Sequence, residues 1–222
     1  MKRKRRGEWI DAVDEMRPIE RTTFCLIGIV PDQIEEFGKL FGSGEKEKLS
    51  GVLMEEAGLP WAKSFEEAWE SGEQEARQRG LFDLMWHRRA MAIDPVLNAP
   101  NFSGWDVLMV VARQVDADLA DLLSNIDGNN RANSRRQDGP EWWKVWHHGT
   151  GAPPGGWLTV EEAALIHEKW RDFAIPEIEE ACLEMQGLSY THQGCWSLMN
   201  DMGGFFAQCA SEKRAVVGEV GL

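Results

Sequence analysis

Residues 22–30 read TTFCLIGIV, and this apolar stretch decides the fold class of the chain. Almost every position is apolar or β-branched, which is typical of a strand buried on both faces rather than of one that alternates between core and solvent. We therefore expect a strand near the centre of a sheet. Residues 214–220, RAVVGEV, have a similar character, and we expect this last strand to pair with the first one.

Helical patterns lie between the two strands. Pro31 is followed by a helix for which the sequence predicts Asp32 as the N-cap and Glu35 as its capping partner. Further helices are predicted at about 45–57, from 64 onward, at about 105–126, 159–173, 176–187 and 196–211. The helix at 105–126 is expected to be continuous, because apolar residues recur at spacings of three to four: Leu108, Val111, Val115, Leu119, Leu122 and Ile126. The predicted class is α+β and helix-rich, with a small mixed sheet and several helices packed around it.

The length of 222 residues is compatible with a single core. We expect a polar leader at residues 1–20 and one compact domain at residues 21–222. Within this domain, residues 127–140 are polar and rich in turn-forming residues, which predicts an exposed loop. Residues 149–156 contain glycines and two prolines and are expected to form a second loop.

The charge balance limits the classes of partner. Lys and Arg number 24 against 37 Asp and Glu, which gives a net charge of −13. Such a chain repels nucleic acids and anionic membranes and attracts basic proteins. The basic residues 2–6 are interpreted as a solubilising or frayed terminus, with a nucleic-acid or localisation arm as the alternative. They are not expected to begin a signal peptide, because no apolar region follows them. No apolar run reaches the length of a membrane span, and four cysteines suit a reducing compartment, so we expect a cytoplasmic protein.

Four segments carry a family resemblance: VPDQI at 30–34, FGSGEKEKL at 41–49, GWLTVEEA at 156–163 and FFAQCASEKRAVV at 205–217. In this order they resemble the YfbM-like family of bacterial proteins of unknown function. The resemblance covers the two ends of the chain and leaves about 61–146 unmatched. It implies no catalytic residues and no cofactor. It implies a bacterial protein similar in arrangement to immunity proteins and other small partner-binding modules.

Motifs for catalysis or metal binding are weak. Cys195 stands in the string QGCW at 193–196, which is similar to the surroundings of a papain-like nucleophile, but every histidine precedes it, whereas that family places its base downstream. His192 and Cys195 have a chelating spacing, yet no C-x-x-C pair supports zinc, and Cys182 and Cys209 fall on predicted helix faces. Neither a Walker sequence nor G-x-G-x-x-G occurs. We therefore predict no metal and no cofactor.

The tryptophans are the strongest anomaly in the composition, with eleven in the chain against one tyrosine. Indoles fill cores, and they also anchor binding surfaces. Core packing is the favoured interpretation of these tryptophans, and a ligand or partner surface is the alternative. On a helix Trp142 and Trp146 share a side while Trp143 lies about 100° away, so in the alternative at least one of them is expected to be partly exposed. The candidate binding surface consists of Trp142, Trp143, Trp146, His147, His148 and Trp157.

These features favour a protein-binding module over an enzyme. The hypothesis is an immunity-type protein that occludes a basic partner. The alternative is a metal- or thiol-dependent hydrolase that uses His147, His148, His192 or Cys195. A third possibility is a structural or regulatory subunit whose tryptophans are buried against another chain. The oligomeric state stays open.

Overall fold

The computed structural model describes residues 24–43, 67, 91–93, 104–126, 139–150, 154–171 and 192–220. Within these ranges, four strands form one sheet in the order β2-β1-β4-β3. The strands are β1 (Phe24–Ile29), β2 (Met91–Ile93), β3 (Pro154–Leu158) and β4 (Ala215–Val220). As predicted, the first and last strands pair at the centre, from Phe24 opposite Val220 to Ile29 opposite Ala215. The α+β class is confirmed, but the described strand pairs are all antiparallel, so the expectation of a mixed sheet is wrong.

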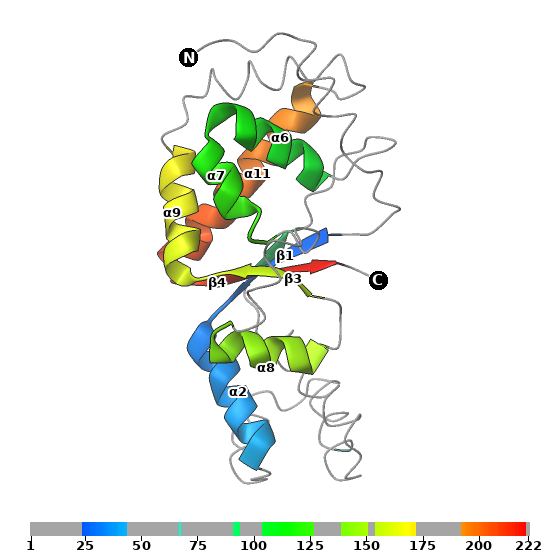
Figure 1. Ribbon diagram of the computed structural model, residues 1–222, viewed down its shortest axis with the longest axis vertical. Coiled ribbons are helices and arrows are strands. Elements are labelled where there is room, and N and C mark those ends of the chain that lie inside the picture. Colours follow the sequence, from blue (N-terminus) through cyan, green and yellow to red (C-terminus); the bar gives the residue numbers. More distant parts are fainter. Residues whose placement is uncertain are drawn as a thin grey trace.

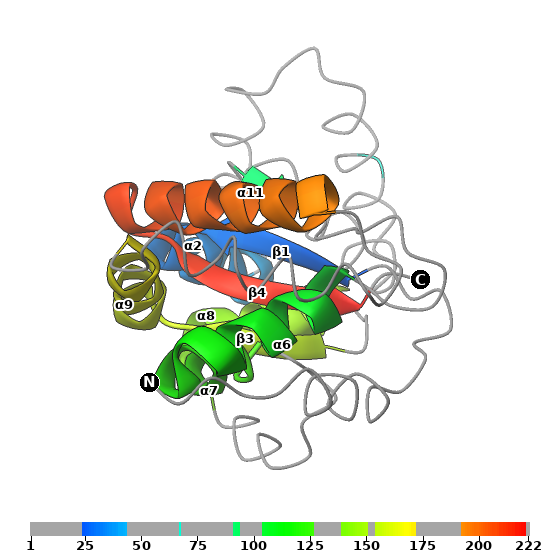
Figure 2. The same ribbon diagram turned by 90° about the horizontal axis from the view of Figure 1, so that it is seen from above.

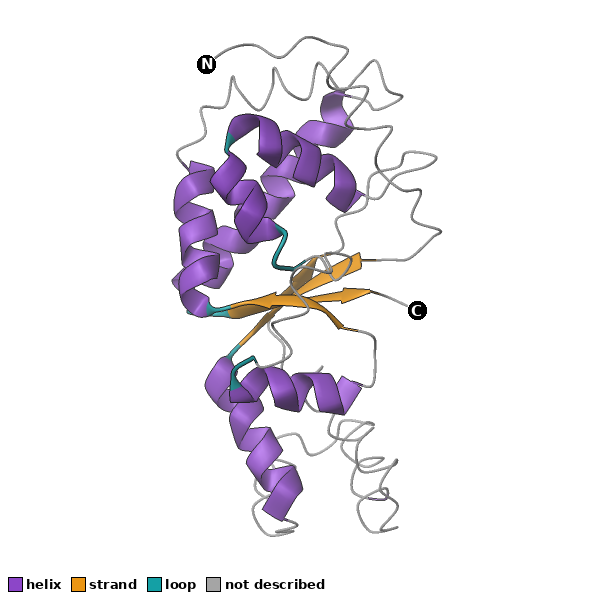
Figure 3. Ribbon diagram, in the orientation of Figure 1, coloured by secondary structure: helices purple, strands orange, loops and turns teal. Residues whose placement is uncertain are grey.

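Helices cover both faces of this sheet, as Figures 1 and 3 show. One face carries α6 (Gly104–Val115), α7 (Ala117–Leu123), α9 (Val160–Arg171) and α11 (His192–Ser211). The opposite face carries α2 (Pro31–Ser43) and α8 (Glu141–Thr150). In the view from above, α11 runs in nearly the same direction as β1 and β4, and α9 lies near one end of it (Figure 2).

The two central strands contribute side chains to both layers. Leu26 and Val216 belong to the core under α6, α7, α9 and α11, whereas Ile27 and Val217 belong to the core under α2 and α8. Successive side chains of a strand point to opposite faces, so a strand covered on both faces must be apolar at consecutive positions. This explains the unbroken apolar run that the sequence shows at 22–30.

Two helix predictions are confirmed in detail. The backbone N–H of Thr159 donates to Glu162 Oε2 at 2.9 Å, and the N–H of Glu162 donates to Thr159 Oγ1 at 3.1 Å, which is the reciprocal capping box that opens α9. In α11 the predicted apolar face is buried throughout, and it consists of Leu198, Met202, Phe205, Phe206 and Cys209. This helix begins at His192, four residues before the predicted start.

The start of α2 differs from the prediction. The helix begins at Pro31, and the carbonyl oxygen of Val30 accepts hydrogen bonds from the N–H groups of Gln33 and Ile34. Asp32 therefore lies in the first turn and is not the N-cap. Proline suits the first helical position, because its φ angle is already helical and its missing N–H would have no partner there.

The predicted helix at 105–126 is divided at Asp116. This residue has φ −150° and ψ 111°, an extended conformation, and its carboxylate caps α7. The apolar spacing passes through the break without a change in period, so periodicity alone could not locate it. Two helices that meet at an angle can both bury their apolar sides, and Leu108, Leu119 and Leu123 are fully buried.

The predicted loop at 149–156 is also partly wrong, because α8 extends to Thr150 and Pro154 begins the edge strand β3. An edge position tolerates proline, since its missing N–H can face away from the ladder. The glycine at 156 is required by a close approach: a Cβ there would lie 1.7 Å from the carbonyl oxygen of Asn125. The N–H of Gly156 donates to the carbonyl of Ile126 at 2.7 Å, which ties β3 to the end of α7.

Several predictions lie outside the described residues. These are the leader at 1–20, the helices at 45–57 and 176–187, the helix from 64 onward except for Glu67, and the loop at 127–138. Strand β2 was not predicted from the sequence, because three residues are too short for a pattern of period two. Among the described helices, none is long and apolar enough to cross a membrane.

Candidate functional site

The tryptophans of the candidate binding surface form an interior cluster. Trp142 and Trp157 pack edge to face with ring centroids 5.6 Å apart, and Trp143 lies 6.3 Å from Trp157. The exposed fractions of Trp142, Trp143, Trp146 and Trp157 are 5%, 4%, 1% and 8%. The expectation that one of these indoles is partly exposed is therefore wrong.

A second contact explains why both sides of α8 are buried. Trp142 and Trp146 belong to the core against β1 and β4. Trp143, which lies about 100° around the helix, is covered by Trp157 of the edge strand and by Gly139. Helical geometry gives the angle between the indoles. Whether the side of α8 that carries Trp143 is also buried depends on the position of β3.

The histidines and cysteine of the hydrolase hypothesis lie on two helices. His147 and His148 are in α8, and His192 and Cys195 are in the first turn of α11. Their side chains are outside the described part of the structure. The two helices cover opposite faces of the sheet (Figure 1), so the fold separates these two pairs.

Cys25, Cys209 and His167 are the other described cysteines and histidine, whereas His87 lies outside the described residues. Burial raises the pKa of Cys209 to about 12, so its thiol stays protonated at neutral pH. Cys25 is half-buried, and its Sγ donates to the carbonyl of Leu26 at 3.9 Å. His167 is half-buried in α9, whereas Cys182 lies outside the described residues. Within the described ranges, no group of three or more His, Cys, Asp or Glu is arranged to hold a metal ion.

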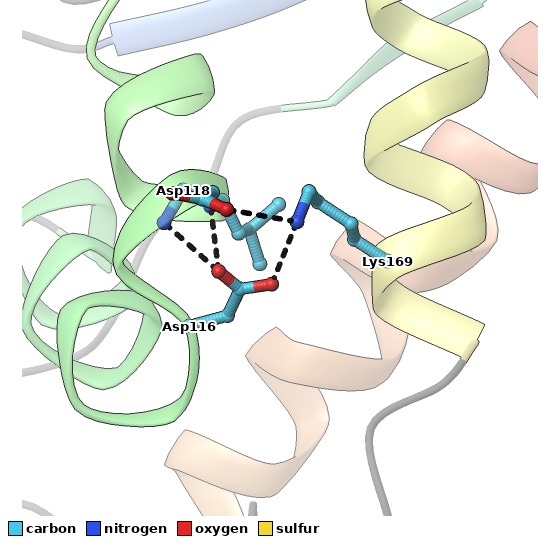
Figure 4. Close-up of polar contacts among 4 residues, drawn as sticks. Asp116, Asp118 and Lys169 are labelled. Carbon is cyan, nitrogen blue, oxygen red and sulfur yellow. Dashed lines mark hydrogen bonds and ion pairs between the residues drawn. The ribbon is translucent and has the colours of Figure 1, made fainter.

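A polar cluster joins the start of α7 to α9 (Figure 4). Asp116 Oδ1 accepts hydrogen bonds from the N–H groups of Asp118 at 2.8 Å and Leu119 at 3.2 Å. Its Oδ2 accepts from Lys169 Nζ at 2.9 Å, and the same ammonium lies 3.7 Å from Asp118 Oδ2. No local pattern in the sequence predicts this cluster, because Asp116 and Lys169 are 53 positions apart in the chain.

These contacts set the charge states of the cluster. Burial acts to raise the pKa of Asp116, but the hydrogen bond from Lys169, those from the two backbone N–H groups and the charge of Lys169 together lower it below its usual value. The hydrogen bond to Asp116 raises the pKa of Lys169. Both groups therefore remain ionised at neutral pH, which suits an ion pair. The protonated ammonium of Lys169 cannot act as a nucleophile, and the lowered pKa makes the carboxylate of Asp116 a weaker base.

The outward side of α9 presents a different surface. Among the described residues, Leu165 is the large apolar residue that is exposed to solvent, with an exposed fraction of 41%. Glu161 precedes it by four positions and Glu168 follows it by three, and both are exposed. Residues at these spacings lie on one side of a helix, so the three form a single stripe. We call Glu161, Leu165 and Glu168 the α9 stripe.

Negative charge is concentrated around this stripe. Helix α9, together with α7 and its cap Asp116, carries six carboxylates against Lys169 and Arg171. Helix α2 carries three carboxylates against one lysine, and α8 carries one of each. The α7–α9 pair with Asp116 therefore has an excess of four negative charges, against an excess of two for α2 and α8 together, while α9 by itself has an excess of one.

Comparisons of the chain with protein-family models, with curated proteins and with solved structures find no match.

Proposed function

We propose that the protein is a binding module for a basic protein partner and that it acts by stoichiometric occlusion, in the manner of an immunity protein. The observation that carries this proposal is the charge of −13, to which the α7–α9 pair with Asp116 contributes six carboxylates against two basic residues. A surface of one sign increases the rate at which an oppositely charged partner is encountered, and it disfavours partners of like charge. The resemblance to the YfbM-like family and a cytoplasmic location belong to the same proposal.

The tryptophans have a supporting role in this proposal. Because the four indoles are buried in the chain itself, they supply packing for α8 and β3 rather than contacts with a partner. The surface available for recognition is then the polar side of the helices, where charge dominates. We therefore expect the association to be limited by electrostatics more than by apolar area.

The test is the dependence of binding on ionic strength. A basic protein recovered by affinity capture at low salt should be purified, shown to form a complex of fixed stoichiometry, and titrated at about 20 and about 200 mM NaCl. Because surface charges are screened within about 10 Å at 0.1 M salt, we expect the association rate to fall at least about tenfold, with a smaller change in the dissociation rate. An affinity that does not change with salt would contradict the proposal.

A further inference from the structure

We infer that the α9 stripe is the docking surface for the partner and that it takes a basic amphipathic helix. This inference rests on the proposed function and specifies its site. The stripe combines an exposed apolar centre at Leu165 with carboxylates on either side at Glu161 and Glu168. An apolar anchor within a polar rim is the usual composition of a protein interface.

The geometry of α9 directs this stripe outward. Ala163 and Ile166 are fully buried against the core, and they define the inward side of the helix. At about 100° per residue, Glu161 lies about 40° and Glu168 about 60° from Leu165, on the outward side of the helix. The stripe therefore runs along nearly two turns of a helix whose other side is fixed in the core.

The neighbouring charged residues of α9 have roles within the fold. Glu162 completes the capping box with Thr159, and Lys169 binds Asp116 and Asp118. The single lysine beside the stripe is thus neutralised by two carboxylates of α7. The stripe itself carries two carboxylates, and Arg171 is the basic residue that follows it at the end of the helix.

The dimensions of the stripe indicate the partner. Three positions at i, i+4 and i+7 match the spacing of one side of a second helix packed along α9. A complementary helix would place a leucine-like side chain on Leu165 and Lys or Arg near Glu161 and Glu168. An extended segment would match the spacing of the stripe less well. A second copy of this acidic chain would match its charge less well.

The experiment uses a fluorescently labelled synthetic peptide in which leucines form one side of a helix and lysines flank them, and a scrambled peptide of the same composition. Binding of each to the full chain is followed by fluorescence anisotropy at about 20 mM NaCl. We expect Leu165→Gln to weaken binding of the amphipathic peptide at least about fivefold. The double variant Glu161→Gln/Glu168→Gln should weaken it similarly and should also reduce its salt dependence.

The matched control is Glu35→Gln/Glu36→Gln on α2, which changes the net charge by the same two units, from −13 to −11. Circular dichroism checks that every variant is folded. If both double variants weaken binding equally and Leu165→Gln has no effect, the α9 stripe is not the docking surface. Charge-driven binding by the chain would still stand. Equal affinity for the scrambled peptide also overturns the amphipathic helix as the partner. If the unmodified chain binds neither peptide at low salt, this inference fails, whereas the proposed function is judged separately by the salt dependence of binding to the purified basic partner.

Discussion

Asp116 and Lys213 each hold a backbone conformation that the neighbouring helix would not adopt by itself. Asp116 is extended between α6 and α7, and its carboxylate replaces the hydrogen-bond acceptors that a continuous helix would have supplied. Lys213 has φ 52°, which places it in the left-handed region after α11. The N–H groups of Lys213 and Arg214 donate to the carbonyls of Ala210 and Cys209, which is the Schellman arrangement.

Replacing Asp116 tests the cap. We expect Asp116→Ala to lower the free energy of unfolding by about 1 kcal/mol, because two N–H groups at the start of α7 lose their acceptor. Asp116→Asn keeps a capping oxygen and should cost less. Urea denaturation measures both, and an alanine variant as stable as the parent would contradict the assigned cap.

The same carboxylate predicts a pH dependence. Its pKa is lower in the folded chain than the usual value of about 3.9 for an unfolded one. The stabilisation is therefore fully present above about pH 5 and is lost as the pH falls through the folded pKa. Denaturation curves between pH 6 and pH 3 should show this loss in the parent, and a smaller one in Asp116→Asn.

Lys213→Gly should stabilise the protein by about 0.5–1 kcal/mol. A left-handed conformation is strained for a residue with a Cβ and is readily adopted by glycine. Lys213→Ala is the matched control, because alanine keeps the strain and removes only the charged chain. Thermal unfolding followed by circular dichroism compares the two, and equal midpoints would show that the Cβ at this position is not strained.

On the sheet face that carries α6, α7, α9 and α11, two helices approach closely where a glycine of one faces an aromatic ring of the other. A Cβ at Gly203 of α11 would lie 2.9 Å from Nε1 of Trp170 in α9, whereas a Cβ at Gly204 meets nothing within 4 Å. Trp170 stacks on Phe206 with centroids 6.4 Å apart, which restricts its movement. The close approach of α9 to α11 at this point therefore requires a residue without a Cβ at position 203. A comparable contact joins α2 and α8, where Gly38 faces Val145.

The adjacent glycines permit a paired test. Gly204→Ala should stabilise the protein by about 0.5–1 kcal/mol through helix propensity. Gly203→Ala gains the same propensity but forces the indole of Trp170 to move, so we expect a net loss of about 1 kcal/mol. Chemical denaturation of both variants gives the difference. Similar stability of the two would mean that α9 and α11 can separate at little cost.

The sheet couples the two helix layers, since β1 and β4 each contribute to both cores. Leu26 and Val216 support one layer, and Ile27 and Val217 support the other. Loss of either layer would expose one side of the same two strands to water. We therefore expect the described elements to unfold as one cooperative unit.

Trp146→Ala tests this coupling on the face of α2 and α8. The indole is 1% exposed, so its removal should cost about 3–5 kcal/mol. Phe206→Ala, on the opposite face, should cost a similar amount. In both variants, tryptophan fluorescence and far-ultraviolet circular dichroism should report the same single transition. Separate transitions for the two probes in either variant would show that the layers unfold independently.

The sequence by itself determined the elements whose signals are local. The apolar runs predicted β1 and β4, the capping box of Thr159 and Glu162 predicted the start of α9, and the apolar period predicted the buried side of α11. These signals depend on hydrogen bonds and periodicities within a few positions, so one segment is enough to define them. The class of the fold follows from their order along the chain.

Only the tertiary structure decided where distant segments meet. The break at Asp116 depends on a cap whose second oxygen binds Lys169, and the edge strand at Pro154 depends on β4 and on the close approach of Gly156 to Asn125. The burial of Trp143 depends on Trp157, which β3 carries to it. The exposed stripe on α9 became visible for the same reason, because which side of a helix faces water is set by the elements that cover the other side.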